Sequence, residues 1–326
     1  MFKIVLAGSV TSSLVTLQQL VHHKMNVVGV FGYEPKNTSE VSGYVSMKEV
    51  CDNNQIAYYP FNKINSIENL NILKELNPDI FFVVGLSQLV SEEMLSVSKM
   101  GNVGFHPTHL PKGRGRAPIA WLILEEKFGA VNFFLMGEGA DDGPIFIQEI
   151  FSVDETDNAS TVEQKILTSI KQALDKWLPV LKKGEWNFIP QNEIDASYYG
   201  KRTAEDGIIN WNNSSAYIDK LIRASSNPHP GAFTFLNTNK IFIWRSKIET
   251  DIKIKGVTGR VLLIKENNFL IQCGEGLLWI SNVTDESFKP VTLKVGQKLG
   301  YYADLEIYNL RKEIQELKEW IQKGTS

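Results

Sequence analysis

Two short segments in the first half of the chain carry side chains of the kinds used in acid–base catalysis. His106 and His109 lie in GFHPTHLPKGRGRAP, and Asp141 and Asp142 lie in GEGADDGPI. Each segment follows a run that we expect to form a strand, and ligands of open parallel sheets bind beyond the carboxyl ends of the strands. A carboxylate that accepts a hydrogen bond from an imidazole fixes the orientation of the ring. We therefore expect one of the aspartates to orient His106 for proton transfer.

The same residues allow two other interpretations. Pro107, Pro111 and the neighbouring glycines could simply shape a loop in which His106 satisfies backbone groups. A histidine of this loop together with Asp141 and Asp142 could also bind a metal ion, although two carboxylates and one histidine form a weak metal signature. Spacing alone leaves the catalytic and the loop-shaping interpretations open, and we expect no metal.

Common nucleotide-binding and nucleophile motifs do not occur in the sequence. The first expected strand is followed by GSVTSS, which is neither GxGxxG nor a Walker A loop, and there is no GxSxG segment. The two cysteines, Cys51 and Cys273, lie far apart and in no CxxC pair. This excludes a disulfide framework and a cysteine zinc site, and it is typical of a reducing compartment.

The composition is that of a globular protein without a strong electrostatic bias. The 326 residues include 34 basic and 37 acidic side chains, for a formal net charge of −3, and 43% are hydrophobic. No bulk field therefore recruits nucleic acid or an anionic membrane. No run reaches the roughly 18 apolar residues of a membrane helix, and the N-terminus has the pattern of a first strand rather than of a signal peptide. We expect a cytoplasmic protein with no nucleic-acid or membrane partner.

Short apolar runs alternate with helical patterns over the first part of the chain. Strands are expected at residues 2–7, 26–31, 56–59, 79–84, 102–105, 130–136 and 145–153. Helical stretches separate most of them, which predicts right-handed βαβ units. A long helix follows, which Ser160 and Glu163 would open as a capping box and Gly184 would close. The expected fold class is α/β, with a Rossmann-like, mostly parallel sheet covered by helices on both faces.

The pattern changes after residue 190, which gives four expected parts. Residues 1–190 form the first domain, 191–205 a polar linker, and 206–304 a small all-β domain of the OB-like barrel type. Residues 305–326 form an amphipathic helix, and two heptads are too few to define a coiled coil. This helix could pack within the chain or across a homodimer. Its apolar positions are Ile307, Leu310, Ile314, Leu317 and Ile321.

The segments GFHPTHLPKGRGRAPIAW and FFLMGEGADDGPI resemble the signature of the formyltransferases that use N10-formyltetrahydrofolate. That family includes methionyl-tRNA, glycinamide ribonucleotide and sugar-nucleotide N-formyltransferases. The resemblance implies that His106 is the catalytic histidine and Asp141 the catalytic aspartate. The family has an asparagine two residues before the histidine, and this chain has Gly104 there. Asn102, earlier on the same face of the strand, is the other candidate for the oxyanion contact, which we expect His106 or a backbone N–H of the loop to supply.

The resemblance also implies a folate site and covers nearly the whole chain. PDIFFVVGLSQLV is similar to the segment that presents backbone groups to the pterin ring of the cosubstrate, N10-formyltetrahydrofolate. EDGIINW and PHPGAFTFL resemble the start of the C-terminal domain in two-domain members. The residues implied in cosubstrate binding are Val84, Gly85, Leu86, Gln88, Leu89, Gly137, Gly139, Ala140 and Asp142.

The acceptor of the formyl group is inferred from the charge of two segments and from the residues of the motif. The loop GYEPKNTSEVSGYVS and the expected linker lack the several basic contacts that a tRNA requires, which favours a small amine. The motif is most similar to bacterial sugar N-formyltransferases, which implies a nucleotide-linked 4-amino-4,6-dideoxyhexose, on a pseudaminic-acid-type or other surface-glycan pathway. The alternatives are a methionyl-tRNA formyltransferase, a formyltetrahydrofolate hydrolase and a non-catalytic binding protein. The expected acceptor contacts are Thr108, Lys112, Arg114, Arg116 and Lys63.

Overall fold

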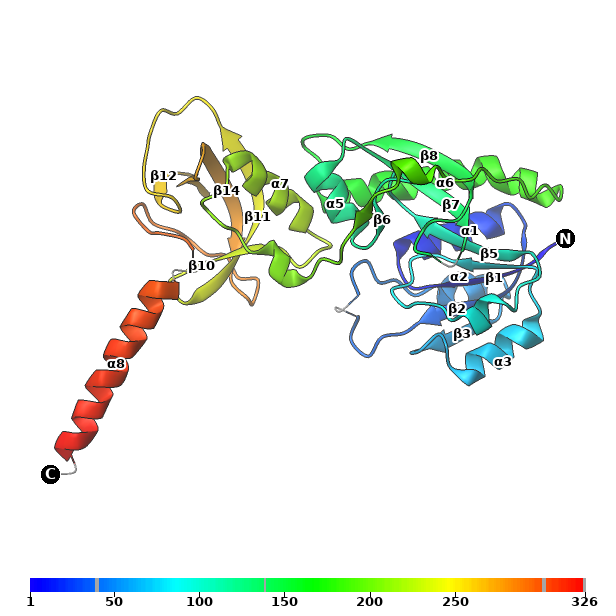
Figure 1. Cartoon of the computed structure of the whole chain (residues 1–326), viewed down its shortest axis with the longest axis horizontal. Helices are drawn as coiled ribbons and strands as arrows, with labels where there is room; N and C mark the ends of the chain where they lie inside the picture. Colours follow the sequence, from blue (N-terminus) through cyan, green and yellow to red (C-terminus); the bar gives the residue numbers. More distant parts are fainter. Residues whose placement is uncertain (39–40, 138, 301–302, 325–326) are drawn as a thin grey trace. The chain divides into compact units, whose positions relative to one another are not determined.

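The structure is a computed structural model that describes residues 1–38, 41–137, 139–300 and 303–324 (Figure 1). It divides into two compact units. Unit 1 comprises residues 1–204 and 224–230, and unit 2 comprises residues 205–223 and 231–326. Of the linker predicted at 191–205, residues 191–204 thus belong to the first unit and residue 205 to the second. None of the helices in the described parts of the chain is both long and apolar enough to cross a membrane.

Unit 1 is built on a seven-stranded, mostly parallel sheet in the order β3-β2-β1-β4-β5-β7-β8. The first five strands are parallel, whereas β7 pairs antiparallel with both β5 and β8. β7 and β8 follow each other directly in the chain, without the crossover helix that a parallel pair requires. The mostly parallel sheet predicted from the sequence is confirmed. The strands are β1 (Lys3–Gly8), β2 (Asn26–Tyr33), β3 (Tyr58–Phe61), β4 (Ile80–Val83), β5 (Gly101–His106), β7 (Phe128–Leu135) and β8 (Ile145–Ser152).

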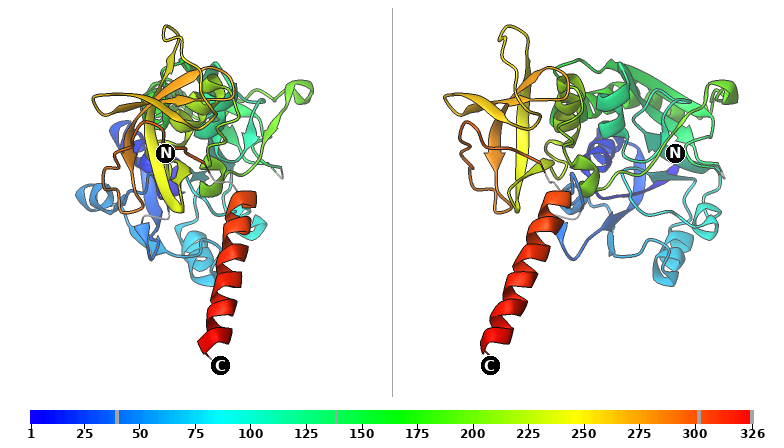
Figure 2. Two further views of the ribbon diagram at one scale, coloured as in Figure 1. Left: turned by 90° about the vertical axis from the view of Figure 1, so that its left-hand side faces the viewer. Right: turned by 60° about the vertical axis from the view of Figure 1, so that its left-hand side comes forward.

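Helices cover both faces of this sheet (Figures 1 and 2). Side chains of the central strand β1 point alternately to the two faces: Ile4 and Leu6 belong to one hydrophobic cluster, and Val5 and Ala7 belong to another. The first cluster includes side chains of α1, α5 and α6, and the second includes side chains of α3 and α4. The helices are α1 (Thr11–His22), α2 (Lys48–Asn53), α3 (Ile67–Leu76), α4 (Glu92–Leu95), α5 (Pro118–Glu125) and α6 (Ala159–Lys182).

The start of α6 differs from the sequence prediction. Asn158 is the N-cap, its side chain accepts a hydrogen bond from the backbone of Thr161, and the Thr161 hydroxyl bonds back to the N-cap backbone. The predicted box of Ser160 and Glu163 is therefore wrong. Ser160 already lies inside the helix and donates to the carbonyl of Asn227 (2.5 Å), while Glu163 accepts from a hydroxyl on α1. The Ser160–Glu163 spacing is compatible with a capping box, but asparagine is also a favoured N-cap residue, and Asn158 begins the helix two residues earlier.

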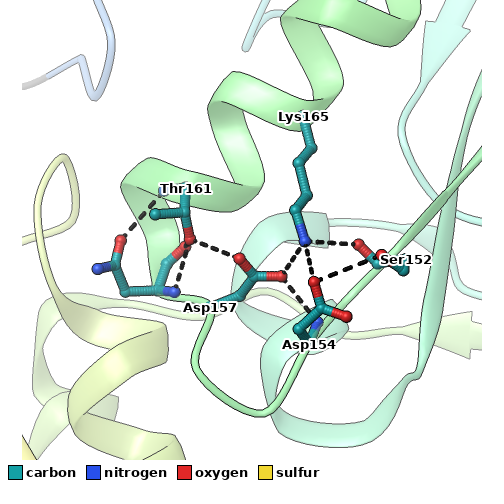
Figure 3. A network of polar contacts seen from close by, with 6 residues as sticks. Ser152, Asp154, Asp157, Thr161 and Lys165 are labelled. Carbon is teal, nitrogen blue, oxygen red and sulfur yellow. Dashed lines mark hydrogen bonds and ion pairs between the residues drawn. The ribbon is translucent and has the colours of Figure 1, made fainter.

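The loop that leads into α6 is held by a network around Lys165 (Figure 3). The Lys165 ammonium donates to Asp154 Oδ2 (2.6 Å), Asp157 Oδ2 (2.6 Å) and the carbonyl of Ser152 (3.1 Å). The Thr161 hydroxyl donates to the other oxygen of Asp157 at 2.8 Å. Burial alone would raise the pKa of Asp157, but these hydrogen bonds and the charge of Lys165 outweigh it and lower that pKa. The network joins the end of β8 to the first turns of α6.

Unit 2 contains a five-stranded antiparallel sheet in the order β10-β11-β14-β13-β12. Its core includes Ile218, Leu221 and Ile222 of α7, which pack against the sheet. The small all-β C-terminal part is confirmed, and its closure as an OB-like barrel stays a prediction. The elements are α7 (Ser215–Ser225), β10 (Ala232–Leu236), β11 (Asn239–Glu249), β12 (Val261–Lys265), β13 (Asn268–Gln272), β14 (Leu277–Thr284) and the terminal helix α8 (Ala303–Gly324).

Candidate active site

The imidazole and the carboxylate singled out in the sequence lie side by side. His106 Nδ1 is 3.3 Å from Asp141 Oδ2, and the backbone N–H of Gly115 donates to the same carboxylate oxygen at 2.9 Å. His106 is 4% exposed, so water reaches little of the ring. Its other nitrogen, Nε2, lies 2.9 Å from the carbonyl oxygen of Gly113, which can only accept a hydrogen bond. Both ring nitrogens therefore face oxygen atoms of the protein.

The route by which Asp141 reaches His106 differs from the sequence argument. That argument placed the two loops at the same edge of the sheet, but β7 runs antiparallel to β5 and its last residue, Leu135, pairs with Val103 near the start of β5. The loop after β7 must turn back to bring Asp141 to His106. Two features of the loop fit this turn: Asp141 has a positive φ of 55°, and a Cβ on Gly143 would lie 1.6 Å from the carbonyl oxygen of Leu135.

The histidine loop rests on a buried amide that the sequence reasoning missed. Asn132, 0% exposed on β7, donates to the carbonyls of His106 (2.8 Å) and Thr108 (2.5 Å). Gln148 on β8 in turn donates to the Asn132 side-chain oxygen (2.6 Å) and to the carbonyl of Leu110 (3.1 Å). A polar residue inside the apolar run VNFFL was the available signal. Because the amide bonds to the carbonyl of His106 and to that of Thr108 two residues later, it holds the backbone where the strand ends and the loop begins.

The place of the family asparagine is filled by apolar side chains. A Cβ on Gly104 would lie 2.6 Å from the ring of Phe134 and 3.0 Å from the side chain of Met136. The amide of Asn102 bonds instead to the end of α4 and the turn after it: its nitrogen donates to the carbonyl of Leu95 and its oxygen accepts from the Ser98 hydroxyl, both at 2.9 Å. The oxyanion role of Asn102 and Gly104 stays a prediction, as does the expectation that His106 or a backbone N–H of the loop supplies the donor.

Arg114 is buried in a network with the segment predicted to be a linker. Its side chain is 0% exposed and binds Glu193 in bidentate fashion, at 2.6 and 2.9 Å. It also donates to the Gln191 oxygen (3.0 and 3.2 Å) and to the Tyr198 hydroxyl (2.9 Å). The hydrogen bonds with Glu193 raise the pKa of Arg114 above its ordinary value, and they lower the pKa of the Glu193 carboxyl. The guanidinium thus has protein partners on several of its donors.

The same network reaches the aspartate loop. The Gln191 amide donates to the carbonyl oxygens of Asp141 (2.8 Å) and Gly143 (2.7 Å). The histidine loop is bound to the linker as well, because β6 (Arg114–Gly115) pairs in parallel with β9 (Tyr198–Tyr199). Gln191 and Arg114 therefore join the loops that carry His106 and Asp141. Sequence reasoning missed Gln191, whose type and spacing gave no signal.

Two family models together cover most of the chain. The model described as "Formyl transferase" matches residues 2–178, and the model described as "Formyl transferase, C-terminal domain" matches residues 201–295. The chain belongs to the formyl transferase family. The two models divide between the α/β part and the β-rich part of the formyltransferase fold described above.

Solved structures of two N-formyltransferases and of HypX have a similar fold. WlaRD, a sugar 3N-formyl transferase solved with dTDP and 5-N-formyl-THF, is 20% identical with a TM-score of 0.63, covering 86% of this chain and 97% of that one. The N-formyltransferase of Helicobacter canadensis, solved with folinic acid and dTDP-3-aminofucose, is 21% identical with a TM-score of 0.63, covering 86% and 99%. A variant of HypX from Aquifex aeolicus is 16% identical with a TM-score of 0.62, covering 90% of this chain and 47% of that one. The chain thus spans about half the length of HypX.

The first segment expected to bind the cosubstrate begins at Val84, directly after β4, and its backbone is held by hydrogen bonds from serine side chains. The carbonyl of Val84 accepts from the Ser13 hydroxyl (2.6 Å), and that of Gly85 accepts from the Ser9 hydroxyl (3.3 Å). These hydroxyls belong to the GSVTSS segment, so its serines hold the backbone of the segment that is predicted to bind the folate. Leu86 packs against the hydrophobic cluster that contains Val5 and Ala7 of β1 and side chains of α3 and α4.

The end of this segment is anchored to the chain that follows β3. The Gln88 amide accepts from the backbone of Ile64 (2.9 Å) and donates to the carbonyl of Asn62 (2.8 Å), while Leu89 is 92% exposed. Gln88 therefore has a clear structural role. Its contact with a folate, like that of Val84, Gly85, Leu86 and Leu89, stays a prediction.

The second segment contains a buried polar atom without a partner. Asp142 Oδ1 is buried, and none of the described residues hydrogen-bonds to it. The Asp142 carboxylate lies against Gly137 and Gly139, where a Cβ would approach its oxygens to 3.0 and 2.2 Å, and Ala140 beside them is exposed. A buried carboxylate oxygen is costly to leave unpaired, so this acceptor fits a ligand with N–H donors. The residues present are therefore compatible with the pterin of a folate.

The remaining residues expected at the acceptor lie around the histidine loop. Thr108 is 1% exposed and its hydroxyl donates to the carbonyl of Lys112 at 2.8 Å, which shapes the loop. Lys112 and Arg116 are exposed, as is Lys63 after β3. These exposed cations, rather than the buried Arg114, have the accessibility that phosphate binding requires. Their contact with an acceptor stays a prediction.

One group in the described parts of the chain has the spacing of a metal site, and it does not include His106 or Asp141. His22, His23 and Asp175 each offer a ligand atom within 4.8 Å of the others. His23 Nε2 already lies 2.8 Å from Asp175 Oδ1, so the histidine and the carboxylate pair with each other.

Proposed function

We propose that the protein transfers the formyl group of N10-formyltetrahydrofolate to the amine of a nucleotide-linked amino sugar. The observation that carries this proposal is the His106–Asp141 pair, at 3.3 Å, on the two loops that match the family signature. The structural similarity to two enzymes whose ligands include dTDP or dTDP-3-aminofucose supports a sugar acceptor, because it extends over 97% and 99% of their chains.

In the proposed reaction the acceptor amine attacks the formyl carbon, and the bond from that carbon to N10 breaks. The amine loses a proton, and N10 gains one as it leaves. Negative charge develops on the formyl oxygen during the attack, and a positioned donor stabilises it. His106 fits the role of this donor, because its Nε2 faces a carbonyl oxygen, which can only accept, and therefore carries a hydrogen.

Asp141 holds the His106 ring in this account. Its Oδ2 accepts from Gly115 as well as facing Nδ1, so its position is fixed from two sides. The Nε2 hydrogen now directed at the Gly113 carbonyl is the one that can turn to the formyl oxygen. The buried, low-dielectric surroundings of His106 strengthen such an interaction.

The acceptor side carries too little positive charge for a tRNA. The exposed cations at the histidine loop are Lys112 and Arg116, which suit one or two phosphates. Tight tRNA binding by phosphate neutralisation needs a larger basic surface, and the loop at 32–46 carries one lysine against two glutamates. A nucleotide diphosphate sugar therefore fits better than a nucleic acid.

A panel of acceptors tests the proposal. The purified protein is incubated with N10-formyltetrahydrofolate and either dTDP- and UDP-linked 3-amino and 4-amino sugars or initiator methionyl-tRNA. We expect a formyl mass increment on one amino sugar and production of tetrahydrofolate in equal amount. Formylation of the tRNA alone would establish the methionyl-tRNA alternative. Formate released without any acceptor would establish a hydrolase, and folate binding without turnover a binding protein.

A further inference from the structure

The terminal helix α8 (Ala303–Gly324) carries a heptad pattern along one exposed face. Ile307, Ile314 and Ile321 are seven residues apart and take position a, and Leu310 and Leu317 take position d. The exposed fractions of these side chains run from 48% to 58%. Among the described residues, none from α8 belongs to the hydrophobic core clusters of the protein. Figure 1 shows α8 as one continuous helix at the C-terminus.

The identity of the apolar residues specifies the number of strands. Isoleucine at position a with leucine at position d favours a parallel two-stranded coiled coil, because β-branched side chains pack well at a in that geometry. Each a position of α8 between 307 and 321 is isoleucine, and both d positions enclosed by them are leucine. The pattern is therefore the one expected for a dimer rather than for a trimer or tetramer.

The charged residues beside the stripe specify its partner and direction. Glu306 and Glu313 take position g, and Arg311 and Lys318 take position e. In a parallel pair, each g residue faces the e residue five positions later on the other helix, which pairs Glu306 with Arg311 and Glu313 with Lys318. In an antiparallel pair, g faces g and e faces e, so like charges would meet. A second copy of the same helix, in parallel, is thus complementary to this face.

The opposite face of α8 has the contacts of a solvated surface. Lys312 and Glu316 form an ion pair at 3.8 Å, and Gln315 donates to Glu319 at 3.0 Å. These four residues occupy positions b, c and f, away from the apolar stripe. Acidic and basic side chains are interspersed along the helix, whereas helices that lie on anionic membranes have an excess of Lys and Arg. The charge pattern therefore favours a helix partner over a lipid surface.

We propose that α8 is a dimerisation helix, which forms a parallel two-stranded coiled coil with α8 of a second copy of this chain. Because the a and d positions from Ile307 to Ile321 span only about two heptads, the pairing is expected to be weak and the dimer to dissociate on dilution. The proposal does not depend on the formyltransferase reaction, since its readout is the state of association.

Sedimentation velocity and light scattering of the full chain over a range of concentrations test the proposal. We expect a monomer–dimer equilibrium in which Leu317→Glu weakens association at least about tenfold, since it places a charge in the apolar layer. Leu317 is 58% exposed, so the fold does not depend on it. The matched control is Gln315→Glu at outer position b, which should leave association unchanged. A chain that is monomeric at all concentrations, or a dimer unaffected by Leu317→Glu, would overturn the proposal.

Direction is tested by cross-linking. Ile314→Cys places a thiol at position a, where it meets its own copy in a parallel dimer but a d residue in an antiparallel one. Cys51 and Cys273 are 0% exposed, so the introduced thiol dominates the oxidised product. We expect a disulfide-linked dimer at Ile314→Cys, and its loss when Leu317→Glu is added. Failure to cross-link in a protein that still dimerises would contradict the parallel arrangement.

Discussion

Replacing Arg114 distinguishes a positioning role from contact with the acceptor. In Arg114→Met, the hydrogen bonds to Glu193, Gln191 and Tyr198 are lost. Each bond that involves a charged group contributes about 1.5–3 kcal/mol and they are not additive, so we expect a total loss of about 3 kcal/mol of unfolding free energy. For a unit of about 200 residues this lowers Tm by about 6–12 °C.

The kinetic effect should appear in kcat. Without Arg114, Gln191 loses a partner on its oxygen while its nitrogen still holds the backbone of Asp141 and Gly143. A displacement of about 1 Å in a catalytic group can cost about a hundredfold in rate, so we expect kcat to fall by about 10- to 100-fold. The KM for the nucleotide sugar should change little. The assay is steady-state formyl transfer at a temperature where the variant is folded.

Two further variants complete this test. Arg116→Met at the exposed neighbour is the matched comparison, and it should raise KM with little change in kcat. Glu193→Gln removes the charge that Arg114 binds, and under the positioning account it does not improve acceptor binding. If Arg114→Met raised KM strongly at unchanged kcat, or if Glu193→Gln lowered KM, Arg114 would contact the acceptor phosphates and the reasoning would be refuted.

Three other outcomes follow from the structure. Lys165→Met removes the charged donor of buried Asp157, so it should lower the free energy of unfolding, measured by urea titration, by about 1–3 kcal/mol. Lys165→Arg keeps a charged donor and should retain most of the wild-type stability. Because the pKa of Asp157 is lowered in the folded state, this carboxylate contributes stability above about pH 4, and the contribution is lost as the pH falls through the folded-state pKa. The difference in unfolding free energy between wild type and Lys165→Met should therefore shrink in acid. A difference that stays constant with pH would contradict this. Burial lowers the pKa of His229, so its neutral form is favoured in the folded state, and stability should fall as pH drops below about 6.5; His229→Gln should flatten that part of the pH–stability curve. Gly143→Ala should abolish formyl transfer or prevent folding of the aspartate loop, as shown by activity and circular dichroism, because a Cβ there would lie 1.6 Å from a carbonyl oxygen.

The sequence predicted the elements of the fold better than the connections among them. Alternating apolar runs predicted the parallel strands, and turn-separated short runs predicted the β-rich C-terminal part. Direction was harder, because an apolar run such as VNFFL is compatible with either orientation. The His106–Asp141 contact was predicted correctly, but from a shared sheet edge that antiparallel β7 does not provide.

The supporting residues of the site could not be read from local patterns. Asn132 and Gln191 act through bonds to backbone groups far away in the chain, and such partners have no sequence spacing to reveal them. Arg114 shows the converse case. Its position in the signature predicted a substrate contact, whereas its burial beside Glu193 depends on a segment 79 residues later. Local chemistry therefore identified two side chains that lie in contact, His106 and Asp141, while long-range contacts determine what positions them.

The central claim is that His106 and Asp141 act together in formyl transfer, and a double-mutant cycle on turnover tests it most directly. The rate of formyl transfer to the identified acceptor is measured for wild type, His106→Ala, Asp141→Asn and the double variant, with folate binding measured by calorimetry in each. We predict that each single change lowers kcat by orders of magnitude, that the double variant is little worse than either, and that folate binding survives, because the two groups work as a unit. Near-normal turnover in either single variant, with the fold intact, would contradict the account.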